Sequence, residues 1–161
     1  MTSMYRCAIK SLIWCMPFLV LAQEHPVSSS ETEHLLDGQF KLESKTDGIP
    51  TNLKQAFSKI TREAPFAMAN PGKKFQATDV VYDRSLPRRR LVFAGVQGET
   101  WFVHYERGGL AHSYFVVAFN VKAQGDVNFA WGCGIADAAS SIEQLRRMVA
   151  TCRLSGADSY W

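Results

Sequence analysis

Residues 88–121, RRRLVFAGVQGETWFVHYERGGLAHSYFVVAFNV, decide the fold of this 161-residue chain. Apolar and aromatic residues recur there with a period of two, which is the pattern of strands that bury one face. Gln97-Gly98 and Gly108-Gly109 interrupt the pattern, and short breaks that contain glycine are typical of β-hairpin turns. Short turns join antiparallel strands, so we expect three consecutive antiparallel strands, at 88–96, 99–107 and 110–121.

The same period continues on both sides of this stretch. It predicts one strand before it, at 75–82, and one strand after it, at 127–132. Gln124-Gly125-Asp126 supplies the turn that leads into the last strand. Because the connections are short, each strand pairs with the next one along the chain, and the five strands form an antiparallel meander.

Two helices flank the predicted strands. In the segment 51–63 the apolar residues fall at i, i+3, i+4 and i+7, the spacing of one apolar helix face. These residues are Leu53, Ala56, Phe57 and Ile60. After the strands, Ser140 and Glu143 form a capping box, which predicts a second helix from 141 to 154.

The cysteines connect the second helix to the sheet. Cys7 and Cys15 lie near the N-terminus, whereas Cys152 falls on the apolar face of the second helix and Cys133 follows the last strand. In an exported protein, the two cysteines of the main domain predict a disulfide between Cys133 and Cys152. A nucleophilic thiol at Cys133 is the alternative interpretation.

These elements predict an α+β fold. An N-terminal helix packs on a five-strand antiparallel meander, and a C-terminal helix is pinned to the sheet by one disulfide. Over residues 50–132, the order of a helix followed by a meander resembles the architecture of cystatin-like folds. No motif accompanies this resemblance, so it implies nothing about function.

Residues 1–22 have the three zones of a signal peptide. Arg6 and Lys10 form a basic start, the run from Ser11 to Ala22 is apolar, and Val20-Leu21-Ala22 offers a cleavage site. The run is shorter than the ~20 residues that a membrane span needs. We therefore expect an exported protein, periplasmic or extracellular, whose mature form begins near Gln23 and has no membrane span; a retained anchor is the alternative.

The mature chain divides into a leader and one domain. Residues 23–44 are polar and rich in serine and glutamate, which predicts a flexible leader, although one of its few apolar residues could dock as an extra strand. Residues 45–161 form the single α+β domain. Loss of 1–22 removes two basic residues and no acid, so the formal net charge falls from +3 to +1. This balance gives no argument for nucleic-acid binding.

The turn between the second and third strands of residues 88–121 sets which side chains share a face. If Gly108 and Gly109 alone form it, Tyr105 lies opposite His112, and His104 and Glu106 point to the other face. The two histidines then cannot share a metal ion, and His104 with Glu106 supplies fewer than the three ligands of a catalytic zinc site. We therefore expect no metal or other cofactor and a hydrogen-bonded structural His104, while a bulge at the glycines would reverse the faces.

One face of the sheet has the composition of a protein-binding surface. On the predicted register it carries Arg90, Trp101, Tyr105, His112 and Tyr114. The opposite face is more uniformly apolar and is expected to pack under the first helix; it carries Leu91, Phe93, Phe102, Phe115, Val117 and Phe119. The basic run 88–90, with Lys73, Lys74 and Arg84 upstream, is either a solvated strand start or a docking patch for an acidic partner.

A small binding module that acts by protein contact, such as an inhibitor or a toxin-neutralising antagonist, fits these features best. Its partner would be another exported or cell-envelope protein, and a homodimer is possible. One alternative is a small secreted enzyme that uses His104, Glu106 or His112. A Ser113–His104 pair could supply a nucleophile and a base, but it lacks the G-x-S-x-G elbow that presents the serine nucleophile in hydrolases. The other alternative is a carrier that encloses a small ligand or lipid under a curled sheet.

Overall fold

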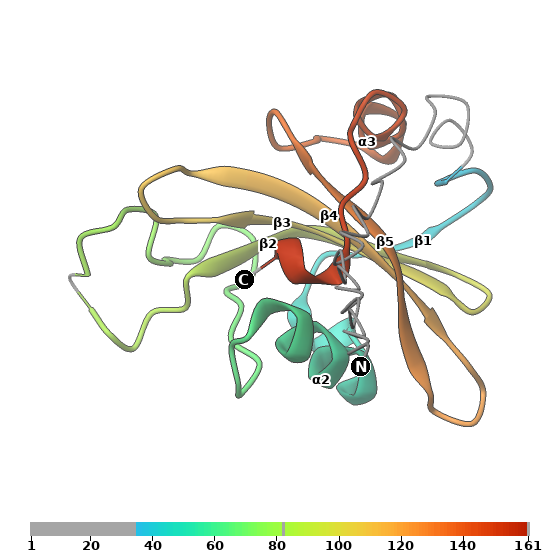
Figure 1. Ribbon diagram of the computed structural model, residues 1–161, viewed down its shortest axis with the longest axis horizontal. Helices are drawn as coiled ribbons and strands as arrows, with labels where there is room; N and C mark the ends of the chain where they lie inside the picture. Colours follow the sequence, from blue (N-terminus) through green and yellow to red (C-terminus); the bar gives the residue numbers. More distant parts are fainter. Residues whose placement is uncertain (1–34, 82, 161) are drawn as a thin grey trace, which may run out of the picture.

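The computed structural model describes residues 35–81 and 83–160. The predicted signal peptide at 1–22 and the first part of the predicted leader lie outside these residues. The predicted α+β architecture is confirmed, with a five-stranded antiparallel sheet between two helices (Figure 1). The helices and strands are β1 (Lys41–Glu43), α2 (Thr51–Thr61), β2 (Arg89–Gln97), β3 (Thr100–Arg107), β4 (Ser113–Val121), β5 (Val127–Ile135) and α3 (Ile142–Val149). Two short 3-10 helices, η1 (Thr46–Gly48) and η2 (Ala157–Ser159), complete the fold.

The strands follow the order β1-β2-β3-β4-β5, but the first strand is not the predicted one. Residues 75–81 form a loop, and Lys41–Glu43 pairs with β2 instead. Leu36 is fully buried against the α3 side of the sheet, and Phe40 packs edge-on against Phe102 at 5.1 Å between ring centres. Leu36 and Phe40 of the predicted leader therefore dock on the sheet, while Leu42 stays exposed, and residues 35–44 are part of the folded domain.

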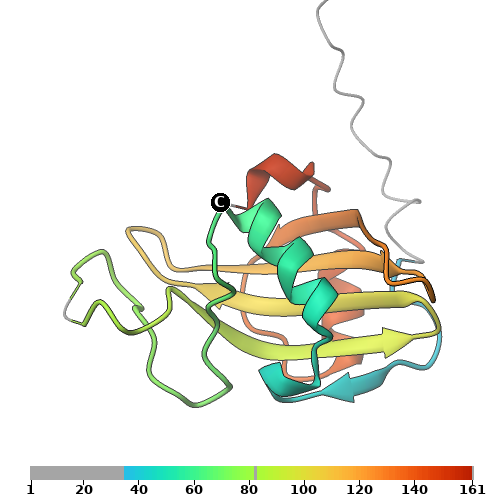
Figure 2. The ribbon, with the colours of Figure 1, turned by 90° about the horizontal axis from the view of Figure 1, so that it is seen from below.

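Helix α2 crosses one face of the sheet (Figure 2). Leu53 and Phe57 are buried against that face, as the apolar spacing predicted. The helix ends at Thr61, two residues earlier than predicted, because Arg62 adopts a left-handed conformation with φ of 52°. The backbone N–H of Arg62 donates to Lys59 O, which caps the last turn.

Helix α3 lies on the other face and begins at Ile142, one residue later than predicted. Ser141, and not Ser140, is its N-cap, and its hydroxyl accepts a hydrogen bond from Gln144 N at 3.2 Å. The S-x-x-Q pair Ser141 and Gln144 therefore caps the helix in place of Ser140 and Glu143. Leu145 and Val149 bury its apolar side, and the helix ends at Val149, before the predicted residue 154.

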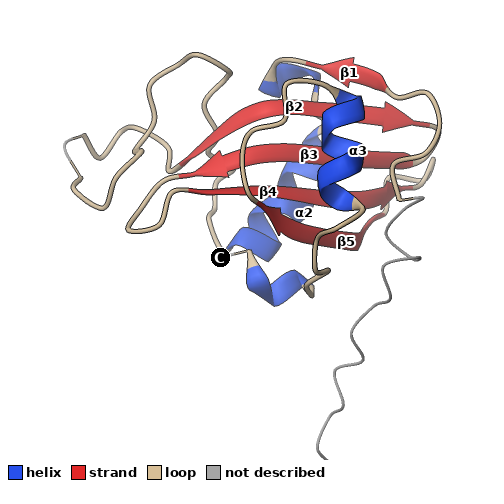
Figure 3. Ribbon diagram, turned by 90° about the horizontal axis from the view of Figure 1, so that it is seen from above, coloured by secondary structure: helices blue, strands red, loops and turns tan. Residues whose placement is uncertain are grey.

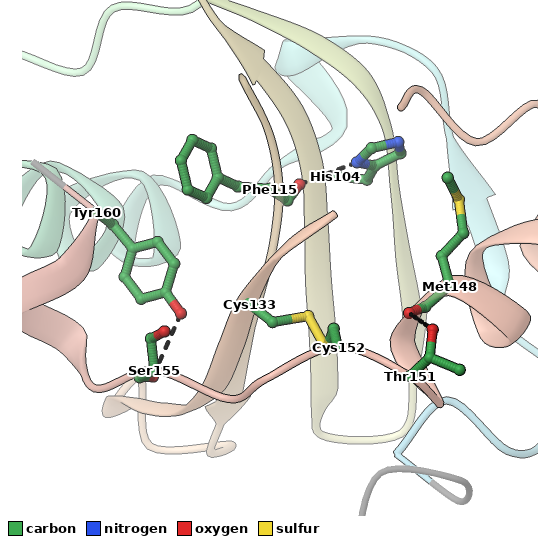
Figure 4. Close-up of a disulfide and its surroundings, with 8 residues drawn as sticks. All are labelled: His104, Phe115, Cys133, Met148, Thr151, Cys152, Ser155 and Tyr160. Carbon is green, nitrogen blue, oxygen red and sulfur yellow. Dashed lines mark hydrogen bonds between the residues drawn. A yellow bond between two sulfur atoms is a disulfide. The ribbon is translucent and has the colours of Figure 1, made fainter. Parts of the chain in front are cut away.

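The predicted disulfide between Cys133 and Cys152 is confirmed (Figure 4). Cys133 is on β5, and Cys152 lies just after α3, with 6.1 Å between the two Cα atoms. Ser155 N donates to Gly132 O at 2.9 Å in the same region. The bridge therefore attaches the chain that leaves α3 to strand β5.

The pairing of β3 with β4 differs from the predicted register. Tyr105 lies opposite Phe115 instead of His112, and the connecting loop is 108–112 instead of Gly108-Gly109 alone. The register moves by three residues, and any odd shift exchanges the faces of one strand relative to the other. Trp101, Val103 and Tyr105 therefore share a face with Phe115, Val117 and Phe119, and that face is covered by α2. The predicted assignment of faces is wrong for β3.

A bulge in β2 makes a second correction. Leu91 lies opposite Tyr105 while Phe93 lies opposite His104, so Val92 is the extra residue. Leu91 consequently packs on the α2 side and Phe93 on the α3 side, although the sequence pattern placed them together. Helices on both faces leave the sheet with two separate apolar cores.

Candidate functional site

Two loops project together from one end of the sheet (Figure 3). We call the described residues 71–81, 83–88 and 108–112 the loop end. Backbone hydrogen bonds join the loops, from Gly109 N to Ala77 O at 3.3 Å and from Gly108 N to Arg88 O at 3.0 Å. A Cβ at position 108 would collide with the carbonyl oxygen of Gln76, so only glycine permits this contact.

Apolar side chains are exposed at the loop end. Leu110 is 92% exposed, Val80 is 51% exposed and Val81 is 47% exposed. In the part of the chain that the structure describes, one other large apolar side chain is exposed, Leu42 on β1, at 45%. Single exposed apolar residues are common on protein surfaces, but three of four in one place indicate a contact surface.

A hollow of about 380 Å³ opens between the two loops. Val81 and Leu110 line it beside the charged residues Asp79, Arg88 and Arg107. Polar residues such as Gln76 and Ser113 also line it, so the hollow combines apolar and polar side chains. Two of the three exposed apolar residues, Val81 and Leu110, thus border a concave surface.

A charged row lies at the base of the loop end, on the α3 side of the sheet. Glu106 is buried, and both of its carboxylate oxygens are occupied: Arg90 Nε donates to Oε1, and His112 Nε2 donates to Oε2 at 2.8 Å. The His112 ring stacks on Tyr114, with 5.1 Å between ring centres, and Arg90 lies 4.5 Å from the centre of the Phe75 ring. The predicted separation of His112 from Glu106 on opposite faces is therefore wrong.

The five residues predicted to form one binding face are divided by the structure. Arg90, His112 and Tyr114 do lie together, in the charged row. Tyr105 is fully buried in the core under α2, so its predicted exposure is wrong. Trp101 is half-buried on the same side as Tyr105 and lies opposite Val96, at the other end of the sheet from the loop end.

His104 is held in the core as a neutral side chain. Its Nδ1 donates to Phe115 O at 2.9 Å (Figure 4). Its Nε2 accepts from Ala139 N at 3.0 Å. Burial lowers the pKa of His104 below its usual value near 6.5. Both ring nitrogens are satisfied only in the neutral form, so the predicted hydrogen-bonded structural role is confirmed.

His104 gives the folded protein a pH dependence. The unfolded chain takes up a proton on this histidine below about pH 6.5, whereas the folded state resists it. The stabilisation is complete above that pH, and we expect it to fall by up to about 1.4 kcal/mol per pH unit below it. Urea unfolding at pH 7.5 and pH 5.5 measures this loss, which His104→Asn should reduce and His112→Asn should not. An equal loss in wild type and His104→Asn would contradict the assignment.

The charged row does not form a complete hydrolytic site. A carboxylate that accepts a hydrogen bond from one imidazole nitrogen can orient the histidine as a general base. Glu106 holds His112 in this way. Ser113 follows His112 in sequence, but its hydroxyl donates to Ala111 O at 2.8 Å. The hollow between the loops is lined by Ser113 and not by His112.

Across residues 35–81 and 83–160, no group of three or more histidine, cysteine or acidic side chains is placed to hold a metal ion.

Sequence patterns did not reveal the apolar tip of the loop end. Val80 and Val81 belong to the segment 75–82 that alternation predicted as a strand, and Leu110 was expected to begin the strand at 110–121.

Among the described residues, no helix is both long enough and apolar enough to cross a membrane. A scan of protein-family models and searches of curated proteins and of solved structures find no match to this chain.

Proposed function

We propose that this protein is exported and acts as a small binding module, which holds another exported or cell-envelope protein by stoichiometric contact. The observation that carries the proposal is the apolar tip of the loop end, where Leu110, Val80 and Val81 are exposed and the first and last of them line a hollow. Apolar residues presented on loops of a rigid scaffold are a common design for protein recognition.

The scaffold holds the loop end in place. Hydrogen bonds between the two loops and the contact of Gly108 with Gln76 limit their movement relative to each other. Arg90 and His112 are fixed at the base by the carboxylate of Glu106. A preformed surface loses less conformational entropy on binding, which favours affinity.

The charge around the tip favours an acidic partner. Lys73, Lys74, Arg84 and Arg88 are exposed in the loop end, against Asp79 and Asp83. Glu106 adds no accessible negative charge, because Arg90 and His112 occupy it. Complementary charge raises the association rate at low ionic strength, so a partner with an acidic rim around an apolar depression fits this surface.

Two features support export. The segment 1–22 has the composition of a signal peptide, and disulfides such as Cys133–Cys152 persist mainly in oxidising compartments. The proposed location is the periplasm or the extracellular medium.

Leu110→Asp should weaken the binding of a partner captured from the native periplasm or medium by about tenfold or more, because it places a charge at the centre of the contact. Leu42→Asp is the matched control, since Leu42 is also exposed but lies on β1, and it should leave the affinity unchanged. Titration calorimetry at two salt concentrations measures the affinities and their dependence on ionic strength. Equal effects of the two substitutions would contradict the proposal.

The two alternatives have less support. The enzyme interpretation draws on the hydrogen bond between Glu106 and His112. For a lipid carrier, the ligand would lie between α2 and the sheet, and that space is filled by Phe57, Tyr105 and Phe119, all of them buried.

A further inference from the structure

The outer edge of β5 is covered along only part of its length. β5 is the last strand of the sheet, so the edge that faces away from β4 has no neighbouring strand among the described residues. The chain after α3 covers the second half of this edge, where Leu154 forms an isolated bridge with Cys133 and Ser155 N donates to Gly132 O at 2.9 Å. No other described segment forms a backbone hydrogen bond with this edge at residues 127–131.

Residues 127–131 also lack the side chains that usually protect an edge. Their sequence, Val-Asn-Phe-Ala-Trp, contains no charge and no proline. The other edge of the sheet ends in β1, which has three residues, two of them charged. A bulge at Ala130 interrupts the pairing of β5 with β4, and Phe129 consequently packs on the α2 side while Trp131 packs on the α3 side. The regular edge before the bulge therefore borders the face that carries α2.

A hollow of about 370 Å³ lies between α2 and this part of β5. Its apolar lining comes from Ala56 and Ile60 of α2 and from Val127 and Phe129 of β5. At one end, Asn52 Nδ2 donates to Gly125 O at 2.9 Å, which holds the turn between β4 and β5 against the start of α2. The uncovered edge and the hollow are adjacent, because Val127 and Phe129 belong to both.

One charge of each sign marks the ends of this hollow. Lys59 lines it from α2, and Asp126 lines it from the turn. Both residues are exposed, and neither forms an ion pair with another described residue. Asn52, which holds the turn beside Asp126, lies seven residues before Lys59, a rise of about 10 Å along an α-helix. Three to four residues of an extended chain span about this distance.

We infer that an extended peptide segment of a partner protein adds to the edge of β5 and places an apolar side chain in the hollow. Only a peptide backbone supplies donors and acceptors at the spacing of a strand, so the uncovered edge selects a peptide over a small molecule. Alternate side chains of the added strand face α2. Charge complementarity then places an acidic side chain near Lys59 and a basic one near Asp126, with the apolar side chain between them.

The direction of the added strand follows from the same charges. Every pair of neighbouring strands in the sheet is antiparallel, and an antiparallel peptide beside β5 runs toward the turn that carries Asp126. Its acidic residue therefore comes first and its basic residue last, as in Glu-Thr-Val-Thr-Lys. This surface goes beyond the proposed contact at the loop end, because β4 runs from the loop end to the turn at 122–126 and the two surfaces lie at its opposite ends.

The test uses the full mature chain and the acetylated, amidated peptide Glu-Thr-Val-Thr-Lys as the probe. Amide hydrogen exchange, followed residue by residue by NMR, measures protection of β5 with and without the peptide. At a peptide concentration ten times its Kd, the outward-facing amides of residues 127–131 should exchange about tenfold more slowly. The amides of β1 are the internal reference and should keep their rates.

Charge reversal on α2 tests the orientation of the peptide. Lys59→Glu should weaken binding of the probe about fivefold, because it replaces an attractive pair at the surface by a repulsive one. A probe that begins with lysine instead of glutamate should restore the affinity in this variant. Lys54→Glu is the matched control: it makes the same change of charge on the same helix, but Lys54 does not line the hollow, so the affinity should stay within about twofold of wild type.

Ala130→Pro tests the edge itself, because it removes a backbone N–H at the bulge, where β4 does not need it. It should abolish the protection, and the charge variants keep the test decisive if this variant fails to fold. Leu110→Asp should leave peptide binding unchanged, which separates this surface from the loop end. Equal losses in Lys54→Glu and Lys59→Glu, no binding of the probe by wild type, or protection of β5 that rises with protein concentration without peptide, the sign of a second copy on the edge, would each overturn the proposal.

Discussion

Replacing Tyr105 with alanine will lower the free energy of unfolding by about 3–5 kcal/mol, the cost of deleting a fully buried aromatic ring. Tyr105 has no solvent exposure and packs edge-on against Phe57 of α2, with 5.1 Å between ring centres. It also stacks on Phe115 of the neighbouring strand at 5.5 Å. Its removal would leave a cavity between the helix and the sheet.

Two further variants make this result specific. Tyr105→Phe keeps the ring and should cost no more than about 1.5 kcal/mol, the contribution of one hydrogen-bonding group. Trp101→Ala should cost less than Tyr105→Ala, because Trp101 is only half-buried at the start of β3. Urea unfolding of the three variants gives the order. If Tyr105→Ala were the least destabilising, Tyr105 would lie on an exposed face and the register of β3 with β4 would be wrong.

Removing the disulfide will lower the free energy of unfolding by about 2–5 kcal/mol. The bridge joins residues 19 positions apart and attaches the segment after α3 to β5. Cys133→Ser, Cys152→Ser and the double variant should have nearly equal effects, because each removes the same bond. Thermal and urea unfolding of the three variants, with and without reductant, measures the loss.

Reductant provides the control for this experiment. It should destabilise wild type and leave the double variant unaffected, since that variant has no bond to reduce. If Cys133→Ser abolished partner binding or an activity while the melting temperature stayed at the wild-type value, Cys133 would be a functional thiol and the structural role would be contradicted.

Local sequence patterns predicted most of the architecture, because they report how much of each segment is buried. The apolar stripe from Leu53 to Ile60 located α2 to within two residues at its C-terminal end. The alternating runs located β2, β3 and β4 with errors of a few residues. The strand predicted at 75–82 failed because alternation shows that a segment could pair but not which edge is available, and Lys41–Glu43 occupies the edge of β2.

The register at the hairpin depended on contacts that are distant in sequence. Two consecutive glycines are the usual signal of a two-residue turn, but Gly108 is required where its backbone meets Gln76, more than thirty positions away. That contact widens the loop to residues 108–112 and shifts the pairing. The shift moved Tyr105 from the predicted binding face into the core.

The candidate sites were only partly accessible to sequence analysis for the same reason. Arg90, His112 and Tyr114 were predicted together, although the predicted register placed Glu106, which joins them, on the other face. A hollow of about 420 Å³ is lined by Arg62 after α2, by Arg88 before β2 and by Arg107 at the end of β3. No local pattern connects these positions, and only the packing of α2 on the sheet brings them together.

Site-specific photo-crosslinking in cells that export the protein tests the central claim, that the loop end contacts another exported protein. A photoreactive side chain at position 110 should give one dominant crosslinked product containing a different protein, whereas the same group at position 42 should give none. Addition of excess unlabelled wild-type protein should remove the product. Crosslinks of equal yield from both positions, or a product at position 110 that contains only a second copy of this chain, would contradict the account.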